Sequence, residues 1–225
     1  MTRTIDLQNF SQLAFAEFGT IPKWGLTYLG IAGVATAAAD LIFWSHRPDV
    51  LLIDYSVGAA LLVGWGVLLY AVSMTMMDSR LSVAGFTRFV ITSIVMMLPT
   101  ALALGLLWLS AIYKNGAGMA FSGVLLIVSL VFIMLLPGWP AMQVKSTKLI
   151  GPLAALRATR GIRWSLVIAG FVTGGVNRAL PEMSSATEVW SALALAVLGG
   201  GIVVLSAMIA ISIAVTSAKL MLAES

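Results

Sequence analysis

The fold class is decided by residues 89–139, which read FVITSIVMMLPTALALGLLWLSAIYKNGAGMAFSGVLLIVSLVFIMLLPGW. Lys114 is the one charged residue in this stretch. A helix that crosses a bilayer needs roughly 20 apolar residues with few charges. Residues 89–113 and 118–139 each meet this requirement, so the stretch predicts two spanning helices joined by a turn near Lys114.

Four further apolar runs lie outward from this pair. They are residues 24–44 and 55–77 on the N-terminal side, and residues 162–180 and 189–218 on the C-terminal side. The run 162–180 is the weakest because two arginines interrupt it. The last run is longer than one straight crossing requires, so it must tilt, bend at its three consecutive glycines or extend beyond the bilayer. The sequence therefore predicts an all-α fold, a polytopic transmembrane bundle of about six helices in a single domain over residues 1–225.

The composition indicates that lipid is the solvent for most of the chain. Of the 225 residues, 60% are hydrophobic and 10% are charged, and the mean hydropathy is +1.02. Soluble domains carry about 25% charged residues, so this chain lacks the charges to cover a water-facing surface. It has no cysteine and one histidine, His46, which excludes thiolate metal sites and multi-histidine sites within one chain. We expect no metal and no cofactor.

The distribution of lysine and arginine predicts the orientation, because cytoplasmic loops of membrane proteins carry an excess of both. With the N-terminus inside, the inside segments contain Arg3, Lys23, Arg80, Arg88, Lys145, Lys148, Arg157, Arg160, Arg163 and Lys219. The outside segments contain Arg47, Lys114 and Arg178. This asymmetry predicts that both termini are cytoplasmic. The cations are spread between apolar runs instead of being gathered on a soluble face, so nucleic-acid binding is not expected.

Two segments are predicted to lie along the membrane surface. Residues 5–21 form an N-terminal interfacial helix, with Glu17 intruding on its apolar side. That side consists of Leu7, Phe10, Ala14, Phe18 and Ile21. Residues 142–163 form the longest inside loop, and Pro152 suits the first turn of a cytoplasmic amphipathic helix within it.

Five cations of this loop form a candidate lipid-binding site. They are Lys145, Lys148, Arg157, Arg160 and Arg163. The three arginines recur every third residue, which places neighbours on adjoining parts of one helix face. Each cation close to an anionic membrane contributes about 1 kcal/mol of attraction. The cluster therefore either binds anionic lipid or serves only to retain the loop inside.

A second candidate contact is an intramembrane ion pair between Asp40 and Arg178. Both residues fall near the outer ends of their runs, at similar depth. A charged residue at membrane depth usually faces the bundle and takes a partner, because leaving it unpaired costs several kcal/mol. In the alternative, each side chain reaches the outer water separately, Arg178 by extending its long side chain toward the interface.

Small residues spaced four apart mark candidate helix contacts. Gly33 with Ala37, and Gly170 with Gly174, form small-xxx-small pairs on the first and fifth runs. Such pairs permit close approach of helix backbones in lipid. They serve packing inside the bundle or, alternatively, a surface for another protein.

No set of residues in the sequence predicts catalysis. Ser122 followed by Gly123 in the fourth run is similar to the nucleophile of intramembrane serine proteases. Such a nucleophile needs a base, and the sixth run contains no histidine, while His46 falls in the first outside loop. We therefore interpret Ser122 as a small packing residue and the protein as a non-enzyme.

The inside loop and the segments around it resemble a known group of proteins. They read LPGWPAM and then GPLAALRATRGIRW, at residues 136–142 and 151–164. This pattern resembles the YciC-like bacterial membrane proteins and the membrane domain attached to some glycerophosphodiester phosphodiesterases. The positions that fit the group are Ala155, Leu156, Gly161 and Trp164, and Thr159 stands where the group has serine. The resemblance implies a bacterial six-helix membrane protein, and it supplies no catalytic residues because the membrane part of that group has none established.

The sequence thus predicts a multi-pass protein of the bacterial inner membrane with cytoplasmic termini. Its expected role is that of a structural, lipid-associated or accessory subunit, with membrane lipids and other membrane-protein subunits as partners. The alternative is a small transporter or permease subunit, in which the inside loop docks onto a nucleotide-hydrolysing partner. An intramembrane enzyme is the third and least supported class.

Overall fold

The computed structural model describes residues 5–45, 51–80, 82–177 and 185–223. In these residues the regular secondary structure is helical, and no strand occurs. The helices are α1 (Leu7–Phe18), α2 (Lys23–Ser45), α3 (Leu51–Met76), α4 (Val83–Ile112), α5 (Gly116–Leu135), α6 (Trp139–Lys145), α7 (Pro152–Ala158), α8 (Arg163–Asn177) and α9 (Val189–Ala223). The expected all-α class is confirmed.

Four segments of the described chain are long and apolar enough to cross a membrane. They are Lys23–Ser45, Val83–Ile112, Gly116–Lys145 and Val189–Ala223. The described part of α8 has 15 residues, which at 1.5 Å per residue gives about 22 Å against a hydrocarbon core of about 30 Å. In α3 the shorter stretch Val63–Met76 is apolar. The structure is therefore that of a helical membrane protein with four candidate spans.

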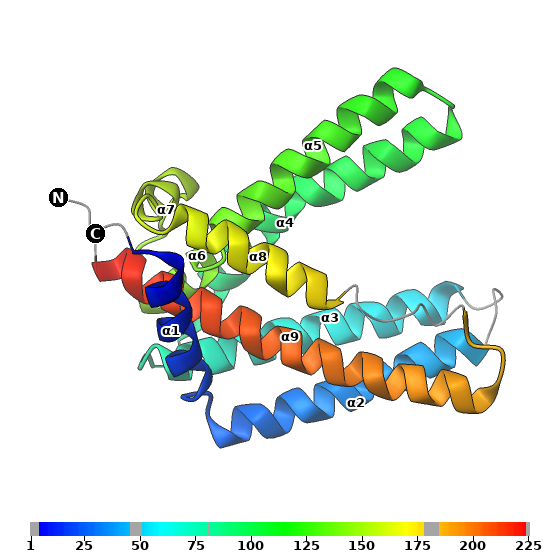
Figure 1. The fold of residues 1–225 in the computed structure, drawn as a ribbon, viewed down its shortest axis with the longest axis horizontal. Helices are drawn as coiled ribbons and strands as arrows, with labels where there is room; N and C mark the ends of the chain where they lie inside the picture. The colour runs from blue at the N-terminus through cyan, green and yellow to red at the C-terminus, as the bar shows by residue number, and fades with distance from the viewer. Residues whose placement is uncertain (1–4, 46–50, 81, 178–184, 224–225) are drawn as a thin grey trace.

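The helices converge at one end of the molecule, which we call the basal end (Figure 1). It contains α1, α6, α7, the beginnings of α2, α4 and α8, and the last turns of α9. From this end α2, α3 and α9 run together in one direction, while the α4–α5 hairpin projects away from them. The shorter α8 contacts both α5 and α9. The first and last described residues both lie at the basal end.

The principal buried cluster lies at the basal end. It includes Trp139 and Met142 of α6 together with Val215, Ala218 and Met221 of α9, all at most 2% exposed. α9 is the central element, since it contacts α1, α2, α3, α6, α7 and α8. It runs for 35 residues without interruption through its three consecutive glycines, a length of about 52 Å. It therefore extends well beyond one straight crossing, and its last turns pack against the basal helices.

The buried helix α6 is the main departure from the sequence-based expectation. The fourth run was expected to continue to residue 139, with a surface loop beginning at 142. Instead α5 ends at Leu135, and Pro137 separates it from α6 because proline supplies no N–H to continue the helix. Every residue of α6 except Lys145 is buried. Within the expected loop a short helix, α7, does begin at Pro152 and ends at Ala158; its amphipathic, cytoplasmic character stays a prediction.

Candidate functional site at the basal end

A buried glutamine fixes the loop that follows α6. Gln143 is fully buried, and its amide bonds both backbone groups of Ile150: Nε2 donates to the carbonyl at 2.9 Å and Oε1 accepts from the N–H at 3.1 Å. The indole Nε1 of Trp139 donates to the same carbonyl at 2.7 Å. Because buried polar groups without partners are costly, these bonds hold the loop in one conformation against α6.

Two arginines brace the short basal helices in the same way. Arg88, in the second turn of α4, donates from Nη2 to the carbonyl of Ser146 just after α6, at 2.7 Å. Arg163, at the start of α8, donates from Nη2 to the carbonyl of Leu156 in α7, at 2.9 Å. In both arginines Nε is buried and has no hydrogen-bond partner. Cations near the C-terminal carbonyls of a helix also interact favourably with its dipole.

The other four cations of the predicted lipid site are exposed at the same end. Lys145 ends α6, Lys148 follows it, Arg157 lies in α7 and Arg160 follows α7. Arg163 differs because it is partly buried and bonded to a backbone carbonyl. The structure thus brings the five predicted residues to one end of the molecule, with the fifth turned inward.

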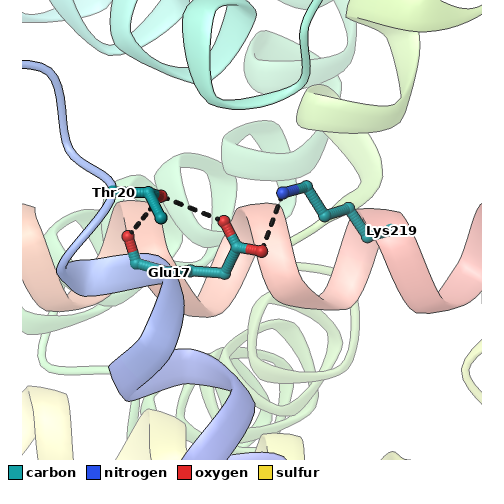
Figure 2. Close-up of polar contacts among 3 residues, drawn as sticks. All are labelled: Glu17, Thr20 and Lys219. Atoms are coloured by element: carbon teal, nitrogen blue, oxygen red, sulfur yellow. Dashed lines mark hydrogen bonds and ion pairs between the residues drawn. The ribbon is translucent and has the colours of Figure 1, made fainter.

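The acidic residue Glu17, which interrupted the predicted apolar side of α1, has a partner in α9. Its Oε1 lies 2.7 Å from Nζ of Lys219, as Figure 2 shows. The other oxygen, Oε2, accepts a hydrogen bond from Thr20 Oγ1 at 3.2 Å. This contact ties α1 to the last turns of α9, and it is the one ion pair between side chains of the described residues.

The apolar side of α1 is turned toward the protein. Phe10 is buried in a small cluster with Ile162, Leu166 and Ile213. The backbone N–H of Ile5 donates to the carbonyl of Gly161 at 3.1 Å. On the outside, α1 exposes three large apolar side chains, Leu7, Leu13 and Phe15. Of the five residues of the predicted apolar side, Phe10, Ala14, Phe18 and Ile21 therefore belong to or pack against buried clusters, and Leu7 is exposed.

Of the predicted pair Asp40–Arg178, the structure describes Asp40 only. Asp40 lies in α2 and points to α9, since a Cβ added to Gly199 would be 3.9 Å from its Oδ2. Arg178 lies outside the described residues. The ion pair therefore stays a prediction.

The predicted small-residue pairs differ in their surroundings. A Cβ added to Gly33 would lie 3.0 Å from the carbonyl oxygen of Gly200, and a Cβ on Gly200 would lie 3.1 Å from Ala37 Cβ, so α2 and α9 touch at this crossing. Gly170 of α8 faces Met134 of α5, whereas nothing lies within 4 Å of a Cβ on Gly174.

Ser122 lies in α5 and is buried. Its hydroxyl donates to the carbonyl of Gly118 in the same helix at 2.7 Å, which is the usual contact of a serine within an apolar helix. Within the described ranges, no three side chains of the kinds that ligate metals lie together. The chemistry that the basal end offers is cationic charge and hydrogen-bond donation.

Two residues of the site, Arg88 and Gln143, were not singled out by their sequence context. Arg88 reads as one more inside cation and Gln143 as a loop residue, because their partners lie in segments whose packing the sequence does not specify. Comparison with protein families, characterised proteins and solved structures finds no match to this chain. The resemblance of residues 136–164 to the YciC-like membrane proteins stays a prediction.

Proposed function

We propose that this chain is a non-enzymatic integral membrane protein of the bacterial inner membrane, whose basal end faces the cytoplasm and associates with anionic lipid. The observation that carries the proposal is the accumulation of cations at that end, beside candidate spanning helices. The exposed cations there include Lys145, Lys148, Arg157 and Arg160, and the described acidic residues at the same end are Asp6, Glu17 and Asp78. In the proposed role the protein is a lipid-associated or accessory subunit of a membrane complex.

In the proposed topology six helices cross the membrane, with α3 and α8 added to the four candidate spans. It is supported by the alternation of loops between the two ends, since the connections between α3 and α4 and between α5 and α8 lie at the basal end. The positive-inside bias then assigns that end to the cytoplasm. In the same topology α1 and α7 lie in the interface, where the exposed Phe15 of α1 and Leu153 of α7 meet the headgroup region.

Reporter fusions test the topology. Fusions within residues 83–87, within residues 145–149 and at residue 225 are expected to report the cytoplasm, because these positions belong to the cation-rich segments. Fusions near residues 49, 115 and 185 are expected to report the outside. If fusions at residues 185 and 225 report the same compartment, the proposed six-span topology is wrong.

Lipid titration tests the association with anionic lipid. The full chain in mild detergent is titrated with phosphatidylglycerol or phosphatidylcholine and analysed by native mass spectrometry. We expect a preference for phosphatidylglycerol that weakens as salt is added, because exposed charges are screened. A variant with glutamine at Lys145, Lys148, Arg157 and Arg160 is expected to lose that preference. Equal binding of both lipids by the unmodified chain would reject the proposed function.

A permease subunit is the second candidate, and the exposed helix α7 is the observation that favours it. Leu153 in its first turn is 70% exposed, and a short exposed helix between two spans suits docking onto a cytoplasmic partner. Purification from mild detergent at native expression separates the two candidates. A nucleotide-hydrolysing protein in stoichiometric amount favours the permease subunit, and membrane subunits without one favour the accessory role.

A further inference from the structure

Three segments of the chain meet around the C-terminal end of α6. The hydroxyl of Ser79, which follows α3, donates to the carbonyl of Val144 at 3.1 Å. Arg88 of α4 donates to the carbonyl of Ser146. The third segment is the loop itself, in which Ser146 Oγ accepts from the backbone N–H of Lys148 at 3.2 Å. These bonds hold the loop in a fixed position beneath the first turns of α4.

This meeting point carries more positive charge than its described surroundings neutralise. Lys145 and Lys148 flank Ser146 in the sequence and are exposed, and Arg80 directly follows Ser79. Asp78 is the acidic residue of the same connection, and neither it nor any other described carboxylate forms an ion pair with these cations. Arg88, which reaches the same loop, is partly buried and has no carboxylate partner among the described residues. A partly buried charge without a counter-ion is unfavourable, so this position favours an added anion.

The guanidinium of Arg88 also has more N–H donors than the hydrogen bonds it makes to the protein. One bond, from Nη2, goes to Ser146, which leaves other N–H groups of the fork. Nε is itself buried, so it is not one of the donors that a ligand from outside would meet. Arginine presents five N–H donors in a planar fork that matches the oxygens of a phosphate. Lysine adds a compact point charge to the same kind of ligand.

We propose that Arg88, Lys145 and Lys148 together form a binding site for a phosphate oxyanion, carried by an anionic lipid headgroup or present as free phosphate. Arg88 supplies directed donors from the bundle side, and the two lysines supply charge from the loop. The inference rests on the proposed function, because the basal end must meet the inner leaflet for a lipid headgroup to reach it. Beyond the proposed function, the inference assigns one bound headgroup to a particular set of the basal cations.

The second group of cations provides the matched control. Arg157 and Arg160 are exposed at the same end and carry the same summed charge as Lys145 and Lys148. Their bracing arginine, Arg163, is only seven residues from its acceptor and belongs to the same local turn. Asp6 lies beside this turn, since the neighbouring Ile5 bonds Gly161. The second group therefore differs from the first in that its arginine bonds within one local turn and joins no distant segment.

The experiment compares two double variants of the full chain by native mass spectrometry in mild detergent. K145Q/K148Q is expected to weaken the first bound phosphatidylglycerol about tenfold or more, because two cations close to the headgroup are lost. R157Q/R160Q removes the same charge and is expected to change that affinity by no more than about threefold. Equal losses in the two variants would overturn the site and leave only general attraction to the membrane. Absence of any phosphatidylglycerol preference in the unmodified chain would reject the proposed function as well.

Added inorganic phosphate identifies the source of the oxyanion. If it displaces the first phosphatidylglycerol and its effect is lost in K145Q/K148Q, the site accepts free phosphate. If it does not compete while the lipid still depends on both lysines, the site belongs to the lipid headgroup. Either result supports the proposed site.

Arg88 is tested with a readout that separates binding from folding, because its bond to Ser146 also stabilises the loop. The measured quantity is the rise in unfolding temperature caused by phosphatidylglycerol, relative to each variant's own lipid-free value. We expect R88K to keep part of this rise and R88Q to lose it. A full rise in R88Q would exclude Arg88 from the site and overturn the proposal.

Discussion

The basal end and the α4–α5 hairpin are both rich in apolar residues, but they differ in side-chain exposure and in hydrogen-bond partners. In the hairpin the large side chains point outward: Trp108 is 64% and Phe121 65% exposed. The hydroxyls of Ser122 and Ser129 bond carbonyls of their own helix. At the basal end, Gln143 instead bonds the loop that follows its helix, and Arg88 bonds Ser146, 58 residues further along the chain. The hairpin is satisfied locally and left open to lipid, whereas the basal end is held by tertiary contacts.

The difference lies in how much of each region is buried within the protein. Lipid tails are as apolar as the side chains, so an apolar side chain gains little free energy when it moves from lipid to a neighbouring helix. Close packing and hydrogen bonds must therefore hold helices together in lipid. At the basal end, side chains from several helices are buried against one another, such as Trp139 of α6 and Val215 of α9. The basal end is therefore where changes in single residues are expected to matter most for stability.

The largest expected difference concerns glycine. A Cβ on Gly138, between α5 and α6, would lie 2.7 Å from the backbone nitrogen of Ala218, whereas nothing lies within 4 Å of a Cβ on Gly123 in the hairpin. Gly138→Ala is expected to lower the free energy of unfolding by on the order of 3 kcal/mol, because α6 must move away from α9. Gly123→Ala is expected to be neutral or slightly stabilising. Thermal unfolding in detergent measures both, and equal midpoints would remove the contrast between the regions.

An intermediate effect is expected for buried polar groups. Gln143→Leu leaves the N–H of Ile150 without its partner, at a cost of about 2 kcal/mol. Ser122→Ala in the hairpin removes a second bond to a carbonyl within its own helix, and is expected to cost less than about 0.5 kcal/mol. Limited proteolysis within residues 146–151 provides a second measurement, since the loop should become cleavable only in Gln143→Leu. A Ser122→Ala variant as unstable as Gln143→Leu would contradict the local character of the hairpin.

The smallest expected effect concerns the ion pair that joins α1 to α9. Glu17→Gln and Lys219→Gln are each expected to lower stability slightly, and the double variant should lose less than the sum of the two. The coupling energy is expected to be about 0.5 kcal/mol, because the Lys219 side chain is 42% exposed and the pair is screened by water. Chemical unfolding at low and high salt measures the coupling and its screening. A coupling that does not fall with salt would show that the pair is not screened as its exposure indicates.

Much of the fold could be predicted because its signals are local. The apolar runs gave the positions of α2, α4 and α9, and Pro152 gave the start of α7. The cations of the candidate site were predicted from their positions between apolar runs. The sequence could not predict which arginines bond backbone carbonyls. Arg163 bonds Leu156, and Arg88, which is outside the predicted set, bonds the loop after α6.

The sequence by itself determined that this is an all-helical membrane protein, since a continuous apolar run and a shortage of charge require lipid wherever the chain folds. Only the tertiary structure decided that α6 is buried, that Arg88 bonds a carbonyl 58 residues away and that Glu17 pairs with Lys219 across 202 residues. The physical reason is that apolarity specifies which segments enter the membrane. A spanning helix is nearly equally apolar on every side, so its sequence does not indicate which side faces a neighbouring helix. The order and rotation of the helices are set by close contacts, such as that of Gly33 with Gly200, and by buried hydrogen bonds that form only once distant segments meet.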